Sequence, residues 1–349
     1  MKQRDLRSLE FDKVLNRLAN HTRSQIGKEL VESHAPSKNI IEIRRWQAET
    51  TEGKELLRLD PAFDIGGWND VREEVKRASR EIVLEPNELE SIGKTISAAK
   101  RIKKFFAEKQ SLYPLLSQIS LGLGYFNELE KQITKAILPG GEIADNASPD
   151  LSSIRRRLTS GRLQIKERLD KIVRSPDYQK YLQDSLVTIR EGRYVIPVKQ
   201  EYRSMISGIV HDQSASGATI FIEPMAVVEA SNEVRRLEAE ERQEIFKILT
   251  ALTKSVAAHS NELAYTLETL GQLDFIMARA RYSDQLNAWA PKISEEYKLN
   301  IQKGRHPLLA GEVVPISTHL GIDFQTLVIT GPNTGGKTVT LKTVGLLVL

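Results

Sequence analysis

The stretch that decides the fold lies near the end of the chain and runs Leu327-Val328-Ile329-Thr330-Gly331-Pro332-Asn333-Thr334-Gly335-Gly336-Lys337-Thr338. Its last eight residues match the phosphate-binding pattern G-x-x-x-x-G-K-[ST]. In such a loop, small residues let backbone N–H groups approach phosphate oxygens, and the following helix adds a partial positive charge at its N-terminus. The pattern predicts a buried strand over residues 326–330, the loop, and then a helix.

Each part of the loop has an expected role. Lys337 is expected to reach the β- and γ-phosphates of ATP, and the hydroxyl of Thr338 is expected to ligate Mg²⁺. A chance match is disfavoured because an apolar run precedes the loop and helical apolar spacing follows it. The predicted nucleotide-binding residues are Gly331, Pro332, Asn333, Thr334, Gly335, Gly336, Lys337 and Thr338.

The sequence ends at Leu349, inside the expected helix. In such folds, the strand that carries the Mg²⁺-holding aspartate normally follows the loop. We therefore expect a fragment of a longer protein, with no catalytic residue of its own and no useful ATP hydrolysis by itself.

Composition limits the class of protein. The 349 residues are 40% hydrophobic and 28% charged, with no cysteine. Disulfides and thiolate metal sites are thereby excluded. The sequence shows neither a membrane-spanning apolar run nor a signal peptide, so we expect a cytoplasmic protein without a membrane partner.

Positive charge is concentrated in one region. Residues 150–203 contain 13 Lys and Arg against 7 Asp and Glu, although the net charge of the whole chain is only +4. This excess fits either a surface that faces a polyanion or an ordinary solvated helix face.

Hydrophobic spacing predicts a mainly α protein. A helical N-terminal region over residues 1–148 precedes a long outgoing helix in 149–184, and the return helices occupy 224–290. The outgoing helix is expected to carry its basic residues on an outer face, and the return helix is acidic in its first half, so the two are expected to pair antiparallel. The start of an incomplete α/β ATPase domain is expected over 291–349.

Between the long helices, alternating apolar residues predict two hairpins over residues 185–223, which we call the β module. A tight turn is expected at Glu191-Gly192. The module is either an ordinary solvated structure or a nucleic-acid clamp. In the second case the candidate phosphate contacts are Arg190, Arg193, Lys199 and Arg203.

This order of elements resembles the MutS family, and within it the bacterial MutS-two subgroup. The resemblance is carried by Leu9-Glu10-Phe11-Asp12-Lys13-Val14-Leu15, by Glu49-Thr50-Thr51-Glu52, by Gly304-Arg305-His306-Pro307-Leu308-Leu309 and by residues 328–346. It implies long lever helices that join a clamp to an ABC-type ATPase. It also implies an adenine pocket at Val313 and Val314, although the aromatic residue that the family has there is absent.

The resemblance further implies a homodimer formed by the full-length protein. Its partners would be double-stranded or branched DNA, with a role in restraining homologous recombination, or collided ribosomes that it rescues. Because the sequence opens directly with the helical region, we expect no mismatch-reading domain of the kind that the family's mismatch-repair branch has, and we expect the endonuclease activity of a C-terminal Smr domain to lie outside this sequence.

Two other classes stay open at this stage. Coiled-coil ATPases of chromosome organisation also combine long helices with an ATPase, but their phosphate loop precedes the helices. A non-catalytic scaffold would not bind ATP at all.

Overall fold

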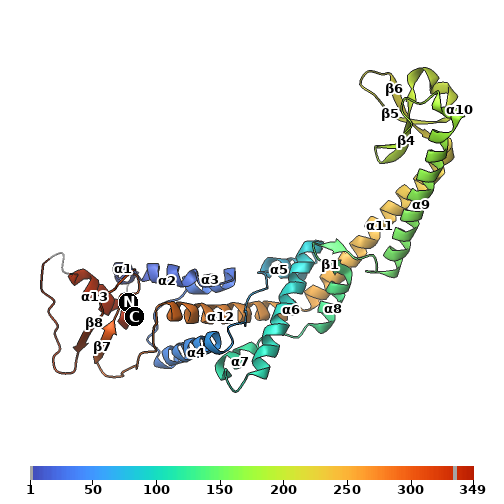
Figure 1. The fold of residues 1–349 in the computed structure, drawn as a ribbon. Helices are drawn as coiled ribbons and strands as arrows, with labels where there is room; N and C mark the ends of the chain where they lie inside the picture. Colours follow the sequence, from blue (N-terminus) through green and yellow to red (C-terminus); the bar gives the residue numbers. More distant parts are fainter. Residues whose placement is uncertain (1–2, 333–335) are drawn as a thin grey trace. The chain divides into compact units, whose positions relative to one another are not determined.

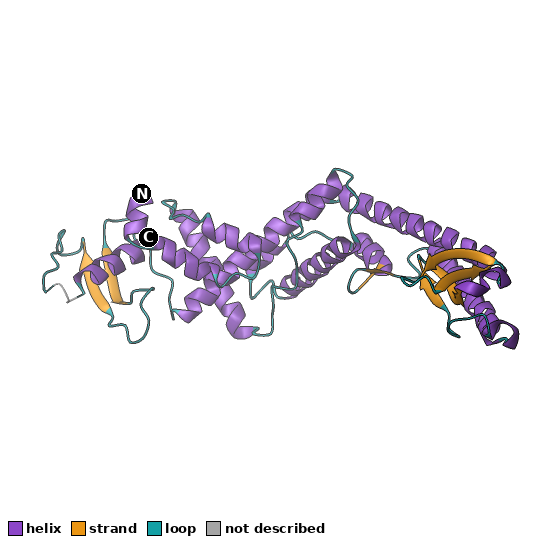
Figure 2. Ribbon diagram, turned by 90° about the horizontal axis from the view of Figure 1, so that it is seen from above, coloured by secondary structure: helices purple, strands orange, loops and turns teal. Residues whose placement is uncertain are grey.

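The computed structural model describes residues 3–332 and 336–349. Within these residues the chain is mainly helical, with three small antiparallel sheets (Figures 1 and 2). It divides into two compact units, each drawn from separate parts of the sequence. The first unit comprises Met1–Lys76, Ser91–Glu130 and Ala258–Leu349, and the second comprises Arg77–Glu90 and Lys131–Ala257. The five contiguous domains expected from the sequence stay a prediction.

The first unit is built around helix α12 (Ser260–Gln285). Leu270, Leu273 and Ile276 of this helix are buried among apolar side chains from the helices that surround it. Two helices of this unit are capped at their N-termini, since the Ser24 hydroxyl accepts from the N–H of Gly27 and the Asn39 side chain accepts from the N–H of Ile41. The other helices wholly within this unit are α1 (Gln3–Ser8), α2 (Phe11–Ala19), α3 (Gln25–Glu32), α4 (Ile40–Leu59), α7 (Pro114–Ser120) and α13 (Lys337–Val348).

The connection between α2 and α3 is fixed to α12 by one buried carboxylate. Asp274 is 0% exposed. It accepts hydrogen bonds from the backbone N–H of Arg23 and from both the N–H and the hydroxyl of Ser24, at 2.9, 2.9 and 2.7 Å. A buried carboxylate with three donors is well satisfied, so the N-terminal helices are firmly joined to α12.

The C-terminal part of this unit differs from the expected arrangement. Strand β7 (Leu299–Gly304) pairs antiparallel with β8 (Ile316–Leu320), a pairing that we did not anticipate. The strand predicted over residues 326–330 is wrong for this structure, in which Val328 is 75% exposed. A strand needs neighbours to receive its backbone hydrogen bonds, and in the described part of the chain β7 and β8 pair only with each other.

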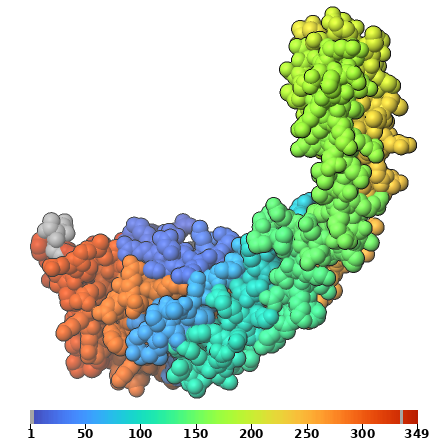
Figure 3. Space-filling model, turned by 45° about the vertical axis from the view of Figure 1, so that its right-hand side comes forward, coloured from blue at the N-terminus to red at the C-terminus, as the bar shows by residue number. Residues whose placement is uncertain are grey.

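In the second unit, α9 (Pro149–Arg174) and α11 (Met225–Ala258) lie side by side (Figures 1 and 3). The two helices run in opposite directions. Ser148, at the start of α9, binds Glu244 in the second half of α11, whereas Arg168, near the end of α9, binds Ala226 at the start of α11. The apolar stripe of α9 includes Ile165, which is 0% exposed and belongs to a core shared with α11. The predicted antiparallel pairing of the two long helices is therefore present.

The β module forms a sheet of four strands in the order β3-β4-β6-β5. Both predicted hairpins are present, and Glu191 and Gly192 have φ values of 48° and 72°, as a tight turn of this type requires. The sequence did not show that the hairpins join through β4 and β6. The strands are β3 (Thr188–Arg190), β4 (Arg193–Lys199), β5 (Gly208–Gln213) and β6 (Thr219–Pro224).

Smaller elements complete the chain. Four helices contain residues of both units, namely α5 (Arg72–Ser79), α6 (Pro86–Glu108), α8 (Asn127–Ala136) and, through its last residue alone, α11. The second unit also holds β1 (Ile137–Leu138), β2 (Glu142–Ile143), α10 (Pro176–Gln179) and the 3₁₀ helix η1 (Gln200–Met205). No helix in the described part of the chain is long and apolar enough to cross a membrane.

Candidate nucleotide-binding loop and nucleic-acid interface

The backbone of the phosphate loop requires glycine at its two described ends. Gly331 has φ of 138° and Gly336 has φ of 76°, conformations that L side chains rarely adopt. A Cβ added to either would meet no atom within 4 Å, so the constraint is the backbone conformation and not crowding. Pro332 is exposed, and Asn333, Thr334 and Gly335 lie outside the described residues.

Lys337 and Thr338 form the first turn of α13. The ammonium group of Lys337 donates to the carbonyl oxygen of Gly331 at 2.6 Å, which closes the loop on itself. The Thr338 side chain is exposed. The helix N-terminus, the ammonium group and the hydroxyl thus belong to one short segment, as phosphate binding needs.

The two valines expected in an adenine pocket lie in the loop between β7 and β8. Val313 is half-buried, whereas Val314 is 82% exposed. Neither lines the cavities described below. The adenine pocket stays a prediction from the resemblance.

Helix α13 is attached to the N-terminal helices by contacts that the sequence did not indicate. Lys342 of α13 donates to the carboxylate of Glu10 at 2.7 Å. Glu10 also binds Lys13, and these two lysines lower the pKa of Glu10 to about 2. Leu9 packs against the backbone of α13 at Gly345. Because these partners lie more than 300 residues apart in sequence, spacing could not have revealed them.

The Gly-Arg-His-Pro loop ahead of β8 is held by the same N-terminal helices. The guanidinium group of Arg17 donates to the carbonyl oxygens of Pro307 and Leu308, both at 2.8 Å. His306 is 7% exposed, burial lowers its pKa, and its Nδ1 accepts from the N–H of Leu308 at 3.2 Å. This part of the family-like motif has a structural role here.

In the β module, Arg193 is an internal side chain. It is 13% exposed, and its guanidinium group contacts Glu223 at 3.3 Å and Asn232 at 2.8 Å. Glu223 is 0% exposed and its other carboxylate oxygen lies 2.7 Å from Nε2 of His211. A phosphate contact by Arg193 would have to leave this buried carboxylate with one partner fewer, so the position is unfavourable for binding a polyanion.

The other three candidates lie nearer the surface, each with a local contact. Arg190 pairs with Asp212 at 3.1 Å and stacks over Phe221. Arg203 donates to the carbonyl oxygens of Ile206 and Gly208 at 3.3 Å, and Lys199 lies 3.5 Å from the carbonyl oxygen of Lys180. The Arg190 pair is about 40% exposed on each side, so water and salt screen it and Arg190 can exchange partners readily.

Six of the eight basic residues of α9 divide into two groups, and the other two, Arg156 and Arg168, donate to backbone carbonyl oxygens. Arg155, Arg157 and Arg162 do not form an outer face as expected, because they make ion pairs with glutamates of α11. Among the residues that the structure describes, no ion pair or hydrogen bond holds the exposed side chains of Lys166, Lys171 and Arg174. Periodicity alone could not separate the two groups, since both are hydrophilic.

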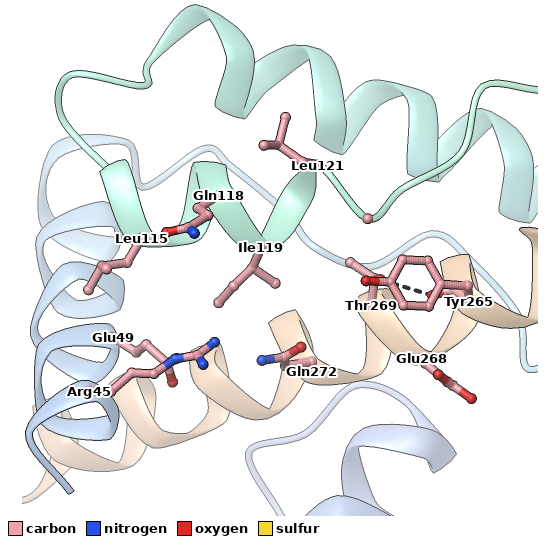
Figure 4. Close-up of a pocket in the computed structure, with 11 residues that line it drawn as sticks. Arg45, Glu49, Leu115, Gln118, Ile119, Leu121, Tyr265, Glu268, Thr269 and Gln272 are labelled. Carbon is pink, nitrogen blue, oxygen red and sulfur yellow. Dashed lines mark hydrogen bonds and ion pairs between the residues drawn. The ribbon is translucent and has the colours of Figure 1, made fainter. Parts of the chain in front are cut away.

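Two of the cavities in the first unit lie away from any residue predicted to bind a ligand. One of about 670 Å³ is lined by Arg45, Glu49, Tyr265 and Gln272, with Glu49 bound to Arg45 (Figure 4). The other, of about 500 Å³, is mostly apolar and includes Trp46 and the 86% exposed Trp289. No group of three or more His, Asp or Glu side chains in the described residues could hold a metal ion.

Comparison with known proteins identifies the family. Over its whole length the chain is 56% identical to the protein named endonuclease MutS2 of Pelotomaculum thermopropionicum, and 48% identical to the protein of the same name of Symbiobacterium thermophilum. It is 46% identical to a third such protein, from a Geobacillus species. The chain spans 44–45% of the length of these relatives. No family model matches.

The chain belongs to the MutS family, in the bacterial MutS2 subgroup. This membership removes the coiled-coil ATPases of chromosome organisation from consideration.

Proposed function

We propose that the chain binds ATP with Mg²⁺ at residues 331–338 and holds nucleic acid through the β module and α9, as part of a longer MutS2-type protein. The observation that carries the proposal is the glycine-rich segment that ends in Lys337-Thr338 and opens α13, with both described end glycines at positive φ. Backbone N–H groups at such a helix start form a natural phosphate site.

The residues present fit a nucleotide with its metal ion. Lys337 would exchange the Gly331 carbonyl for phosphate oxygens, and the exposed Thr338 hydroxyl would hold Mg²⁺. When bound, the ion would neutralise phosphate charge. The remaining Mg²⁺ ligands would come from the phosphates and water, as is usual for this small, strongly hydrated ion.

A fluorescent ATP analogue with Mg²⁺ tests the nucleotide site. We expect Lys337→Ala to weaken binding at least about tenfold, because the ammonium group is lost from the phosphates. Lys28→Ala is the matched control, since this exposed lysine of the same unit makes only a surface pair with Glu32. Equal affinity of the two variants would contradict the proposal.

Nucleic-acid binding is supported by Lys166, Lys171 and Arg174 of α9, which make no ion pair or hydrogen bond with the residues that the structure describes, and by the screened pair of Arg190. Contacts of this kind hold the phosphate backbone without reading the sequence. The name of the relatives, endonuclease MutS2, also points to nucleic acid as their substrate. Branched DNA and ribosomal RNA on collided ribosomes share this backbone chemistry, and a direct comparison separates them.

In the complete protein, we infer that α9 and α11 act as a lever. Two ATPase domains of a homodimer would close on ATP, and the closure would be carried along these helices to the β module. Such coupling requires that ATP favours one arrangement of the clamp over another. Restraint of recombination or rescue of ribosomes would follow from holding or releasing the nucleic acid, and strand cleavage would belong to a further domain of the longer protein.

A further inference from the structure

We propose that Glu10 is a positioning residue for the phosphate loop, because it holds α13, the helix that the loop opens, through Lys342. Glu10 stands at the corner between α1 and α2. The inference rests on the proposed ATP binding and assigns a role in it to the start of the chain.

The corner has a backbone conformation that is uncommon for glutamate. Glu10 has φ of 60°, in the left-handed region, where a side chain is usually unfavourable. Its carboxylate receives one lysine from its own helix, Lys13, and one from α13, Lys342. Unfavourable backbone conformations persist where the surrounding contacts over-determine them, and here those contacts reach the helix of the loop.

The position of Lys342 connects the corner to the loop. It follows Lys337 by five residues, which corresponds to about 7.5 Å along the axis of an α-helix. The side chains of Glu10 and Lys342 are each 28% exposed, so the pair is partly shielded from water. A contact at this distance fixes the first turns of α13 without using the side chains of Lys337 and Thr338.

Packing adds to the ion pair. A Cβ built on Gly345 would lie 2.5 Å from Cδ2 of Leu9, so the corner fits closely against the helix backbone only because residue 345 has no side chain. From β7, a Cβ on Gly304 would lie 2.9 Å from Cδ1 of Leu347. Helix α13 is therefore supported at the corner and at β7.

Helix α2, which begins next to Glu10, is itself held in place by other parts of the unit. At the far end of α2, Arg17 binds the loop ahead of β8, and Leu18 is buried with Phe275 and Tyr282 of α12. In addition, Arg281 donates to the carbonyl oxygen of His21 at 2.7 Å. Glu10 thus connects α13 to the most buried helix of this unit.

A helix that is already ordered presents its N–H groups without a further loss of entropy when phosphate binds. The removal of Glu10 leaves Lys342 without its partner and loosens α13. We expect Glu10→Gln and Lys342→Gln each to weaken binding of a fluorescent ATP analogue about fivefold. Because the two substitutions break the same contact, the double variant should bind the ATP analogue no more weakly than either single variant.

Hydrogen exchange over residues 337–348 without nucleotide gives a second readout. Both single variants should exchange faster there. Lys13→Gln is the local control, because it removes the partner that does not touch α13. Glu29→Gln is the matched control, because it breaks an ion pair with Arg72 in the same unit, at 2.8 and 2.9 Å. Both controls should leave affinity and exchange as in the unmodified chain.

The outcomes are distinct. Unchanged exchange in Glu10→Gln overturns the inference, and so does faster exchange with unchanged affinity, since Glu10 would then hold the helix without positioning the loop. Absence of nucleotide binding by the unmodified chain would refute the proposed function instead. In that case the exchange measurement alone decides whether Glu10 holds α13.

Discussion

The guanidinium group of Arg193 lies 3.3 Å from the carboxylate of Glu223, a side chain with no exposed surface. Arg193 comes from β4 and Glu223 from β6, the two inner strands of the sheet. The second hydrogen bond of Arg193 goes to Asn232 of α11. One charged pair therefore joins both hairpins of the β module to the helix that leaves it.

Arg193→Met should loosen the β module. Removing one partner of a buried ion pair leaves a charge without compensation and costs about 3–5 kcal/mol. Because His211 still contacts Glu223, the loss of stability should lie near the lower end of this range. Hydrogen exchange of the β4 and β6 amides measures the local opening free energy directly.

Arg190→Met is the control, because its partly exposed pair with Asp212 contributes under about 1 kcal/mol. The double variant Arg193→Met with Glu223→Leu should recover much of the lost protection, since it removes both charges. Unchanged exchange in Arg193→Met would show that the pair does not hold the module together.

The pairing of α9 and α11 should depend on its apolar seam more than on its ion pairs. Ile165→Ala removes a side chain that is 0% exposed and should cost about 2–5 kcal/mol. Arg162→Ala breaks a half-exposed pair with Glu238 and should cost under about 1 kcal/mol. Amide exchange of α9 in the two variants gives the comparison, and a larger effect of Arg162→Ala would reverse this order.

Nucleic-acid affinity should follow the unpartnered cations of α9. We expect the triple variant Lys166→Ala, Lys171→Ala and Arg174→Ala to bind branched DNA or ribosomes at least about tenfold more weakly. The slope of log affinity against log salt concentration should fall by the equivalent of about two to three phosphate contacts. Arg190→Ala should add to this loss. Filter binding at several salt concentrations measures both quantities for each target.

The matched control replaces three exposed lysines of the first unit by alanine, and each of them pairs with a neighbour on its own helix: Lys28, Lys76 and Lys104. The charge change is identical, so a general electrostatic effect would weaken both triple variants alike. Equal losses would remove α9 as the binding surface.

Acid should weaken the attachment of α13. The pKa of Glu10 is lowered from 4.5 to about 2, so its contribution to stability is fully present above about pH 4.5 and is lost as the pH falls toward 2. Glutamine does not titrate. The difference in melting temperature between the unmodified chain and Glu10→Gln should therefore be largest near neutral pH and shrink between pH 4.5 and 3. A difference independent of pH would contradict the role of the charge.

Local patterns in the sequence were enough to predict local structure. The turn at Glu191-Gly192 and the long helix after Pro149 depend on residues close together in the chain, and both are present. The strand at 326–330 failed because strand formation depends on neighbours that a single segment cannot specify.

The same difference between local and distant contacts holds for the candidate sites. The motif ending in Lys337-Thr338 was visible because phosphate binding uses consecutive residues. The internal position of Arg193 was not visible, since arginine in a hairpin looks the same whether it faces water or a buried glutamate. The Glu10–Lys342 contact joins opposite ends of the chain, so only the folded structure brings it into view.

Strand β6 ends at Pro224 and helix α11 begins at Met225, so no flexible residue separates them. The helix has 34 residues and extends for about 50 Å. A twist of the sheet is therefore passed directly to the first turn of α11. Such a twist would then appear as a rotation or tilt of α11.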